Sequence, residues 1–207
     1  MTHTDRRLVV IHYPQARDLG GIEALQTLAN VTVVRARAPQ AVQGARWLLL
    51  PDSHALTQDL AWLRAQGLDT TIAHHAQAGG AVLGLCAGLQ MLGEALIDTE
   101  RWEGNCPGLG LLPLVSSIQQ GAASPDLQEQ VFGVLPGAWQ VWSGQRFWSQ
   151  VAPAAQTVQH PAMAAKGDVA QPVLPGVGWR NVQGNVLGLY LRGVLQDEGL
   201  RQALCTG

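Results

Sequence analysis

The residues from Gly79 to Gly93 read GGAVLGLCAGLQMLG, a short apolar run followed by a helical pattern, with one cysteine between them. The run Ala81–Leu85 is typical of a buried strand. The segment Ala87–Ile97 is predicted to be a helix, because its leucines recur at helical spacing. Cys86 would then occupy a strained strand-to-helix turn that exposes its central residue. At such a turn the positive end of the helix dipole stabilises a thiolate.

A cysteine that follows an apolar strand also has a simpler interpretation. Free cysteine is often a small buried side chain with no chemical role. The glycines at positions 84 and 88 favour a functional turn, because a tight turn needs close approach of the backbone. The pattern alone leaves both interpretations open.

Composition limits the classes of function. A chain of 207 residues fits one domain with a sizeable core, and we expect a single domain over residues 1–207. A net charge of −2 gives no electrostatic argument for binding nucleic acid or an anionic membrane. No apolar run reaches the ~20 residues of a membrane span, and the first apolar segment is too short for a signal peptide. We therefore expect a cytoplasmic protein.

The three cysteines are scattered along the chain, at positions 86, 106 and 205. They show no spacing typical of a zinc site, and a chain this apolar does not need a disulfide framework. We expect neither a metal nor another cofactor.

Strands and helices are expected to alternate along the first half of the chain. Strands are predicted at Arg7–His12, Val31–Arg35 and Trp47–Leu50, and helices at Ile22–Leu28, Leu56–Gln66 and Thr70–Gln77. Gly67 suits the position after a helix, and Asp69 is expected to cap the next one. Beyond Cys106 we expect added β-structure and loops, with a closing helix at Asp197–Leu204. The alternation predicts a three-layer α/β/α fold with a mostly parallel sheet.

Five motifs follow one another along the chain. They are Leu48–Pro51, Asp59–Arg64, Gly84–Gly93, Gly108–Pro113 and Gly184–Leu191. In this order they resemble the glutamine amidotransferase domain of cobyric acid synthases, a class I, triad-type domain of the cobalamin pathway. The resemblance covers most of residues 46–204, and it implies the flavodoxin-like fold of class I glutamine amidotransferases.

The resemblance also implies a chemistry. In that chemistry the Cys86 thiolate attacks the side-chain amide of glutamine and forms a thioester, which releases ammonia. The backbone N–H of Ala87 would stabilise the oxyanion, and Gln90 would line the same pocket. A general base and acid, a histidine in the family, must move the protons.

Three positions depart from the family pattern. The family ends its last core strand with Tyr-Leu-His-Gly, whereas this chain has Arg192 in place of the catalytic histidine. Arginine stays protonated, so Arg192 would favour a Cys86 thiolate but deliver no proton to ammonia. Asp52 replaces the glycine of the oxyanion hole, where its carboxylate would repel an oxyanion. Gln140 replaces the acid of a Gly-Tyr-Glu-Ile-His motif.

Three functions remain open at this point. In the first, the domain is noncatalytic or impaired, and it binds an anion such as a small carboxylate through Cys86, the helix N-terminus and Arg192. Alternatively, it is an active glutaminase in which His54, which follows the strand ending at Leu50, serves as the base. In the third, it is another cysteine-dependent hydrolase or transferase, with Arg192 binding a substrate carboxylate.

The resemblance also implies a partner. The synthetase part of the family depends on ATP, but this sequence has no phosphate-binding loop of the Gly-x-x-x-x-Gly-Lys-[Ser/Thr] type. Any amidation would therefore need a separate ATP-dependent synthetase subunit that takes up the ammonia.

Overall fold

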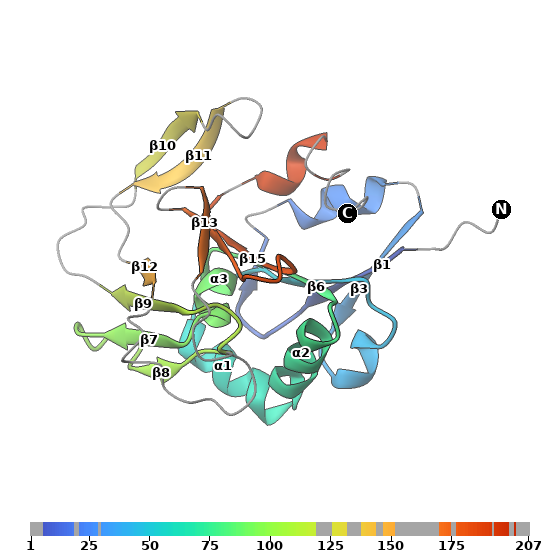
Figure 1. Cartoon of the computed structure of the whole chain (residues 1–207), viewed down its shortest axis with the longest axis horizontal. Coiled ribbons are helices and arrows are strands. Elements are labelled where there is room, and N and C mark those ends of the chain that lie inside the picture. Colours follow the sequence, from blue (N-terminus) through green and yellow to red (C-terminus); the bar gives the residue numbers. More distant parts are fainter. Residues whose placement is uncertain are drawn as a thin grey trace.

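The computed structural model describes residues 6–18, 21–28, 30–118, 126–131, 138–143, 147–151, 170–174, 177–191, 193–198 and 201. Its centre is a seven-stranded sheet with the strand order β13-β14-β15-β6-β4-β1-β3 (Figure 1). These strands are β1 (Arg6–Ile11), β3 (Val31–Ala36), β4 (Trp47–Leu50), β6 (Ala81–Leu85), β13 (Gln171–Leu174), β14 (Gly178–Arg180) and β15 (Val186–Leu189).

The pairing of these strands confirms the mostly parallel sheet. β3, β1, β4, β6 and β15 pair in parallel with one another, whereas β14 and β13 add an antiparallel edge next to β15. The inner parallel strands are apolar on both faces, as in the adjacent buried pairs Val9 and Val10 on β1 and Leu48 and Leu49 on β4. Such continuous apolar runs are expected where helices cover both faces of a sheet.

Helical segments cover the two faces of the sheet, which confirms the three-layer α/β/α prediction (Figure 1). Helices α1 (Leu56–Ala65) and α2 (Leu68–Gln77) pack together on one side. The segments η1 (Ile22–Thr27) and η3 (Val194–Gln196) contact each other on the opposite side. A further short segment, η2 (Pro39–Val42), follows β3.

The smaller sheets contain the added β-structure expected beyond Cys106, together with short strands that precede it. A four-stranded sheet has the order β12-β9-β7-β8, with β7 (Ala95–Asp98), β8 (Cys106–Pro107), β9 (Leu114–Ile118) and β12 (Phe147–Val151). β10 (Asp126–Val131) pairs with β11 (Ala138–Ser143), and β2 (Ala16–Arg17) pairs with β5 (Asp52–Ser53).

The predicted helix Ala87–Ile97 is wrong in its second half. Helix α3 spans only Ala87–Leu92, and the chain then enters β7. Gly93 leaves the helix with φ −65° and ψ 179°, and Glu94 N–H donates to the carbonyl of Leu114 on β9 at 2.8 Å. Leu96 is buried in the smaller sheet instead of on a helix face, so tertiary pairing overrides the helical spacing of the leucines.

Three other helix predictions need adjustment. The segment from Ile22 is a 3-10 helix, and α2 begins at Leu68 with Gly67 at its N-cap, so Asp69 lies in the first turn and does not cap the helix. Gly67, with φ 69°, also follows the C-cap of α1, as predicted. The predicted helix Asp197–Leu204 lies largely outside the described residues. Within the described part of the chain, every helix is too short or too polar to cross a membrane.

Candidate functional site

Cys86 lies at the turn from β6 to α3, between two central elements of the fold. Its backbone has φ 51° and ψ −110°, a conformation that is strained for any residue with a side chain. Its N–H donates to the carbonyl of Leu189 on β15 at 2.8 Å, and its carbonyl accepts from Gln90 N–H at 3.3 Å. The strained strand-to-helix geometry agrees with the sequence prediction. The sequence also predicted that this turn exposes its central residue, but Cys86 is only 7% exposed.

The two glycines around Cys86 are in tight contact with backbone atoms. A Cβ on Gly84 would lie 2.6 Å from the carbonyl oxygen of Gly88, and a Cβ on Gly88 would overlap the carbonyl oxygen of Leu50. The start of α3 therefore packs directly on the ends of β6 and β4. This packing fixes the N-terminus of α3 relative to the loop that follows β4.

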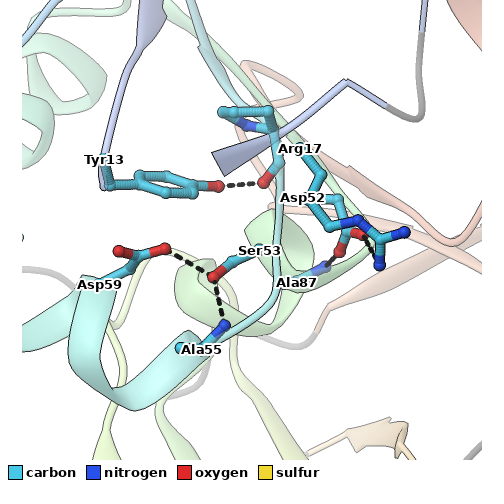
Figure 2. Close-up of polar contacts among 8 residues, drawn as sticks. Tyr13, Arg17, Asp52, Ser53, Ala55, Asp59 and Ala87 are labelled. Atoms are coloured by element: carbon cyan, nitrogen blue, oxygen red, sulfur yellow. Dashed lines mark hydrogen bonds and ion pairs between the residues drawn. The ribbon is translucent and has the colours of Figure 1, made fainter. Parts of the chain in front are cut away.

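The N–H of Ala87, which the sequence suggests as an oxyanion donor, already has an acceptor. Asp52 on β5 accepts it through Oδ1 at 3.0 Å, and the other carboxylate oxygen lies 3.8 Å from Nη1 of Arg17 (Figure 2). Burial raises the pKa of Asp52, whereas the N–H groups of Ala87 and Ser53 and the charge of Arg17 oppose this rise. The first N–H of α3, which the sequence suggests as part of a site for an outside anion, is therefore bonded to an internal carboxylate.

A second group of polar contacts fixes the loop that carries Asp52 (Figure 2). The hydroxyl of Tyr13, a fully buried side chain after β1, donates to the carbonyl of Pro51. Ser53 Oγ donates to Asp59 Oδ2 at 2.6 Å and accepts from Ala55 N–H at 3.0 Å. Burial raises the pKa of Tyr13 well above its ordinary value, and the nearby charges of Asp52, Asp59 and Cys86 add to this rise.

The structure places the other predicted site residues as follows. Gln90 is buried in α3, one turn beyond Cys86, with 4% of its surface exposed. His54 is exposed, and its backbone N–H donates to the carbonyl of Gln15 at 3.1 Å. Gln140 lies on β11 opposite Glu129 on β10, and its side chain is outside the described residues. Arg192 is also outside them, so its place relative to Cys86 stays a prediction.

Three residues of the site were not suggested by sequence reasoning, namely Tyr13, Arg17 and Asp59. Tyr13 had a usable signal, because it follows a strand that neighbours β4 in a parallel sheet, and strand ends share one edge. Asp59 occupies a buried position on the amphipathic helix α1, where an acid needs a polar partner. Arg17 had no signal, since a two-residue strand leaves no pattern. The described residues contain no group of three side chains that would bind a metal.

Comparison with known proteins assigns the chain to a family. Residues 7–199 match the family of CobB/CobQ-like glutamine amidotransferase domains. This chain belongs to that family. The match covers both the turn around Cys86 and the loop that carries Asp52, so the CobB/CobQ-like domain includes the whole site described above.

Relatives of this CobB/CobQ-like domain include longer proteins. The cobyric acid synthases of Paracidovorax citrulli (strain AAC00-1) and Acidovorax sp. (strain JS42) are each 50% identical to it, over 197 and 198 residues. These matches cover 95% and 96% of the chain but 40% of each relative, so the chain spans about two fifths of the length of these relatives.

Solved structures support the fold. A glutamine amidotransferase crystal structure aligns with a TM-score of 0.63 and 19% identity, covering 96% of this chain and 95% of that one. The PurLQS structure from Thermotoga maritima aligns with a TM-score of 0.55 and 14% identity, over 95% and 92% of the two chains. At these identities the likeness concerns the fold alone, and it confirms the predicted class I amidotransferase type.

Proposed function

We propose that this chain is a single glutamine amidotransferase-like domain of the cobyric acid synthase type whose glutaminase activity is impaired or absent. The observation that carries the proposal is the hydrogen bond from Ala87 N–H to Asp52 Oδ1 at 3.0 Å. Glutamine hydrolysis by a cysteine needs a free donor for the oxyanion of each tetrahedral intermediate. Here the donor next to Cys86 is already bonded to a carboxylate.

An oxyanion donor that is already bonded to Asp52 is expected to lower kcat, and the size of this effect can be estimated from oxyanion donors removed by mutation in other enzymes. Removing one oxyanion donor costs roughly 10²–10³ in kcat in well-studied hydrolases. A carboxylate in the same place adds repulsion, because its charge has the same sign as the oxyanion. The effect of Asp52 on turnover is therefore expected to reach at least this range.

The residue at position 192 supports the same proposal independently. General acid–base catalysis contributes about 10²–10⁴-fold, and an arginine cannot give up its proton near neutral pH. Without a proton donor, ammonia leaves the tetrahedral intermediate slowly. Two separate parts of the chemistry, oxyanion stabilisation and proton transfer, are thus weakened in one chain.

The ligand and partner follow from the family. We propose that the pocket takes glutamine or another small carboxylate, and that the domain works with an ATP-dependent synthetase subunit in the cytoplasm. The relatives named cobyric acid synthase, of which this chain matches 40%, support such a partner and a place in cobalamin biosynthesis.

A second candidate function is an active glutaminase that uses His54 as its base. One observation favours it: His54 lies close enough to Asp52 for its charge to lower the pKa of that carboxyl. The exposed position of His54 weighs against a role beside the buried Cys86. The alternative of another cysteine-dependent hydrolase depends on Arg192, which lies outside the described residues.

The test is the release of ammonia and glutamate from glutamine by the purified chain, beside its Cys86→Ala variant. Each protein is assayed alone and with a full-length cobyric acid synthase whose own nucleophilic cysteine has been replaced, which supplies the synthetase. We expect Cys86-dependent release to be absent, or at least about 10²-fold slower than that of the same cobyric acid synthase with its cysteine intact. Release near the rate of the intact synthase that disappears in Cys86→Ala would refute the proposal, and loss of this release in His54→Ala would then establish the second candidate.

A further inference from the structure

Arg17 and Asp52 face each other across the shortest strand pair of the described residues. β2 and β5 run antiparallel, with Ala16 opposite Ser53 and Arg17 opposite Asp52. Side chains that are directly opposite in an antiparallel pair lie on the same face. The register therefore brings the guanidinium of Arg17 to the carboxylate of Asp52, with Nη1 and Oδ2 3.8 Å apart.

The carboxylate of Asp52 divides its contacts between two partners. Oδ1 accepts the N–H of Ala87, and Oδ2 lies toward Arg17 (Figure 2). Only 11% of the Asp52 side chain is exposed, whereas 35% of the Arg17 side chain is. A carboxylate this deeply buried is costly without a compensating charge, so removal of Arg17 favours rotation of Asp52 toward water.

The position of Arg17 is fixed by contacts other than its own ion pair. In the same segment, Gln15 N–H donates to Asp59 Oδ1 at 3.2 Å, and the Gln15 carbonyl accepts from His54 N–H at 3.1 Å. Asp59 also accepts from Ser53, the neighbour of Asp52. The backbone around residues 13–17 is thus tied to the loop of residues 51–55. These ties fix the backbone that carries Arg17, which keeps its guanidinium within reach of Asp52.

We infer that Arg17 is a positioning residue that acts through Asp52, holding its carboxylate on the Ala87 N–H and so keeping the oxyanion donor closed. The two residues together form an internal lock, which we call the Arg17–Asp52 lock. The inference rests on the proposed function, in which the closed donor accounts for low activity, and it names the residue that maintains the closure. It also implies that any partner that separates β2 from β5 would open the donor.

The backbone amide of Ala87 gives a direct readout of the lock. Ala87 is the first residue of α3, so its N–H has no acceptor within the helix, and Asp52 protects it from exchange with solvent. Amide hydrogen exchange at Ala87, followed by NMR on the full chain, is measured for the wild type, Arg17→Ala, Asp52→Ala and the double variant. We expect Arg17→Ala to speed exchange about fivefold, as for the loss of one partly exposed ion pair.

The double variant separates an effect through Asp52 from any other effect of Arg17. If Arg17 acts through Asp52, exchange at Ala87 in the double variant equals that in Asp52→Ala alone. Arg17→Lys, which keeps the charge, restores part of the protection. As controls, the amide of Leu111, which donates to the Leu92 carbonyl at 2.9 Å, keeps its wild-type rate, and Arg180→Ala on β14 leaves Ala87 unchanged.

Two results would overturn the inference. The first is an Ala87 exchange rate that Arg17→Ala leaves unchanged, and the second is a double variant whose effect is the sum of the single effects. Neither result depends on glutamine turnover. Conversely, unimpaired glutaminase activity of the wild type would refute the proposed function, while the exchange data would still decide whether the lock exists.

Discussion

The Cα of Gly88 lies so close to the carbonyl oxygen of Leu50 that a Cβ on Gly88 would overlap this oxygen. The same Cβ would also lie 2.9 Å from the carbonyl oxygen of Pro51. Both neighbours are backbone atoms at the end of β4, so no rotation of a side chain relieves the contact. The start of α3, and with it Cys86, is therefore held against the end of β4 by a glycine.

Gly88→Ala is expected to destabilise the fold by about 3 kcal/mol, because overpacking against backbone forces the helix and the strand apart. Gly79→Ala is the control: Gly79 has φ 85° but open space around its Cα, so it reports the cost of a positive φ alone, about 1 kcal/mol. Urea unfolding of both variants measures the two costs. A Gly88→Ala variant no less stable than Gly79→Ala would contradict the tight packing.

The Gly88 contact also illustrates what the sequence could reveal. The glycines around Cys86 predicted a tight strand-to-helix turn, because glycine allows two backbone segments to approach closely. The strands were predictable from apolar and β-branched runs. The end of α3 was not predictable, because the leucine spacing continues past Gly93, whereas in the structure Gly93 turns to extended backbone and Glu94 pairs with Leu114.

Asp52 marks the limit of sequence reasoning at the site. At this position the resemblance implies a glycine, and from an aspartate there the sequence predicted repulsion of an oxyanion. The hydrogen bond from Ala87 to its carboxylate joins residues 35 positions apart, and its geometry depends on the β2–β5 pair. A pair of two-residue strands has no periodicity in the sequence, so neither Arg17 nor the closure of the donor could be inferred before the structure.

Asp59→Ala is expected to cost about 2 kcal/mol of stability, because it leaves the Ser53 hydroxyl and the Gln15 N–H without their acceptor. Asp59 is 1% exposed, so water cannot fully replace the lost carboxylate. Asp69→Ala, in the first turn of α2, is the matched control and should cost about 0.5 kcal/mol through the helix dipole. Thermal unfolding of both variants measures the difference. Equal losses of stability in the two variants would show that Asp59 does not join the segment of Gln15 to the loop of Ser53.

Asn185 links the end of α2 to β15. Its Nδ2 donates to the carbonyls of Ala76 and Gly80 at 2.8 and 2.9 Å, and its Oδ1 accepts from Asn181 at 2.9 Å. Asn185→Ala loses these bonds and is expected to cost about 2 kcal/mol. Asn185→Asp should cost more, because it brings a carboxylate against two carbonyl oxygens. Chemical unfolding of the two variants ranks them, and a more stable Asp variant would contradict the assigned orientation of the amide.

The buried carboxyl of Asp52 should make stability depend on pH in a defined direction. Burial raises its pKa in the folded state above the ordinary value of about 4. The folded protein therefore binds this proton at a higher pH than the unfolded chain does. The resulting stabilisation is fully present below the unfolded pKa and is lost as the pH rises through the folded pKa.

Asp52→Asn removes this loss, because the amide is uncharged at every pH and its oxygen still accepts the Ala87 N–H. The free energy of unfolding of the variant, minus that of the wild type, should therefore increase between about pH 4 and pH 7. Urea unfolding across this range measures the difference, in which the titrations of all other groups cancel. Asp69→Asn, the same chemical change in the first turn of α2, is the control. A difference that stays constant with pH, or decreases, would mean that the Asp52 carboxylate is not destabilised by its burial beside Ala87.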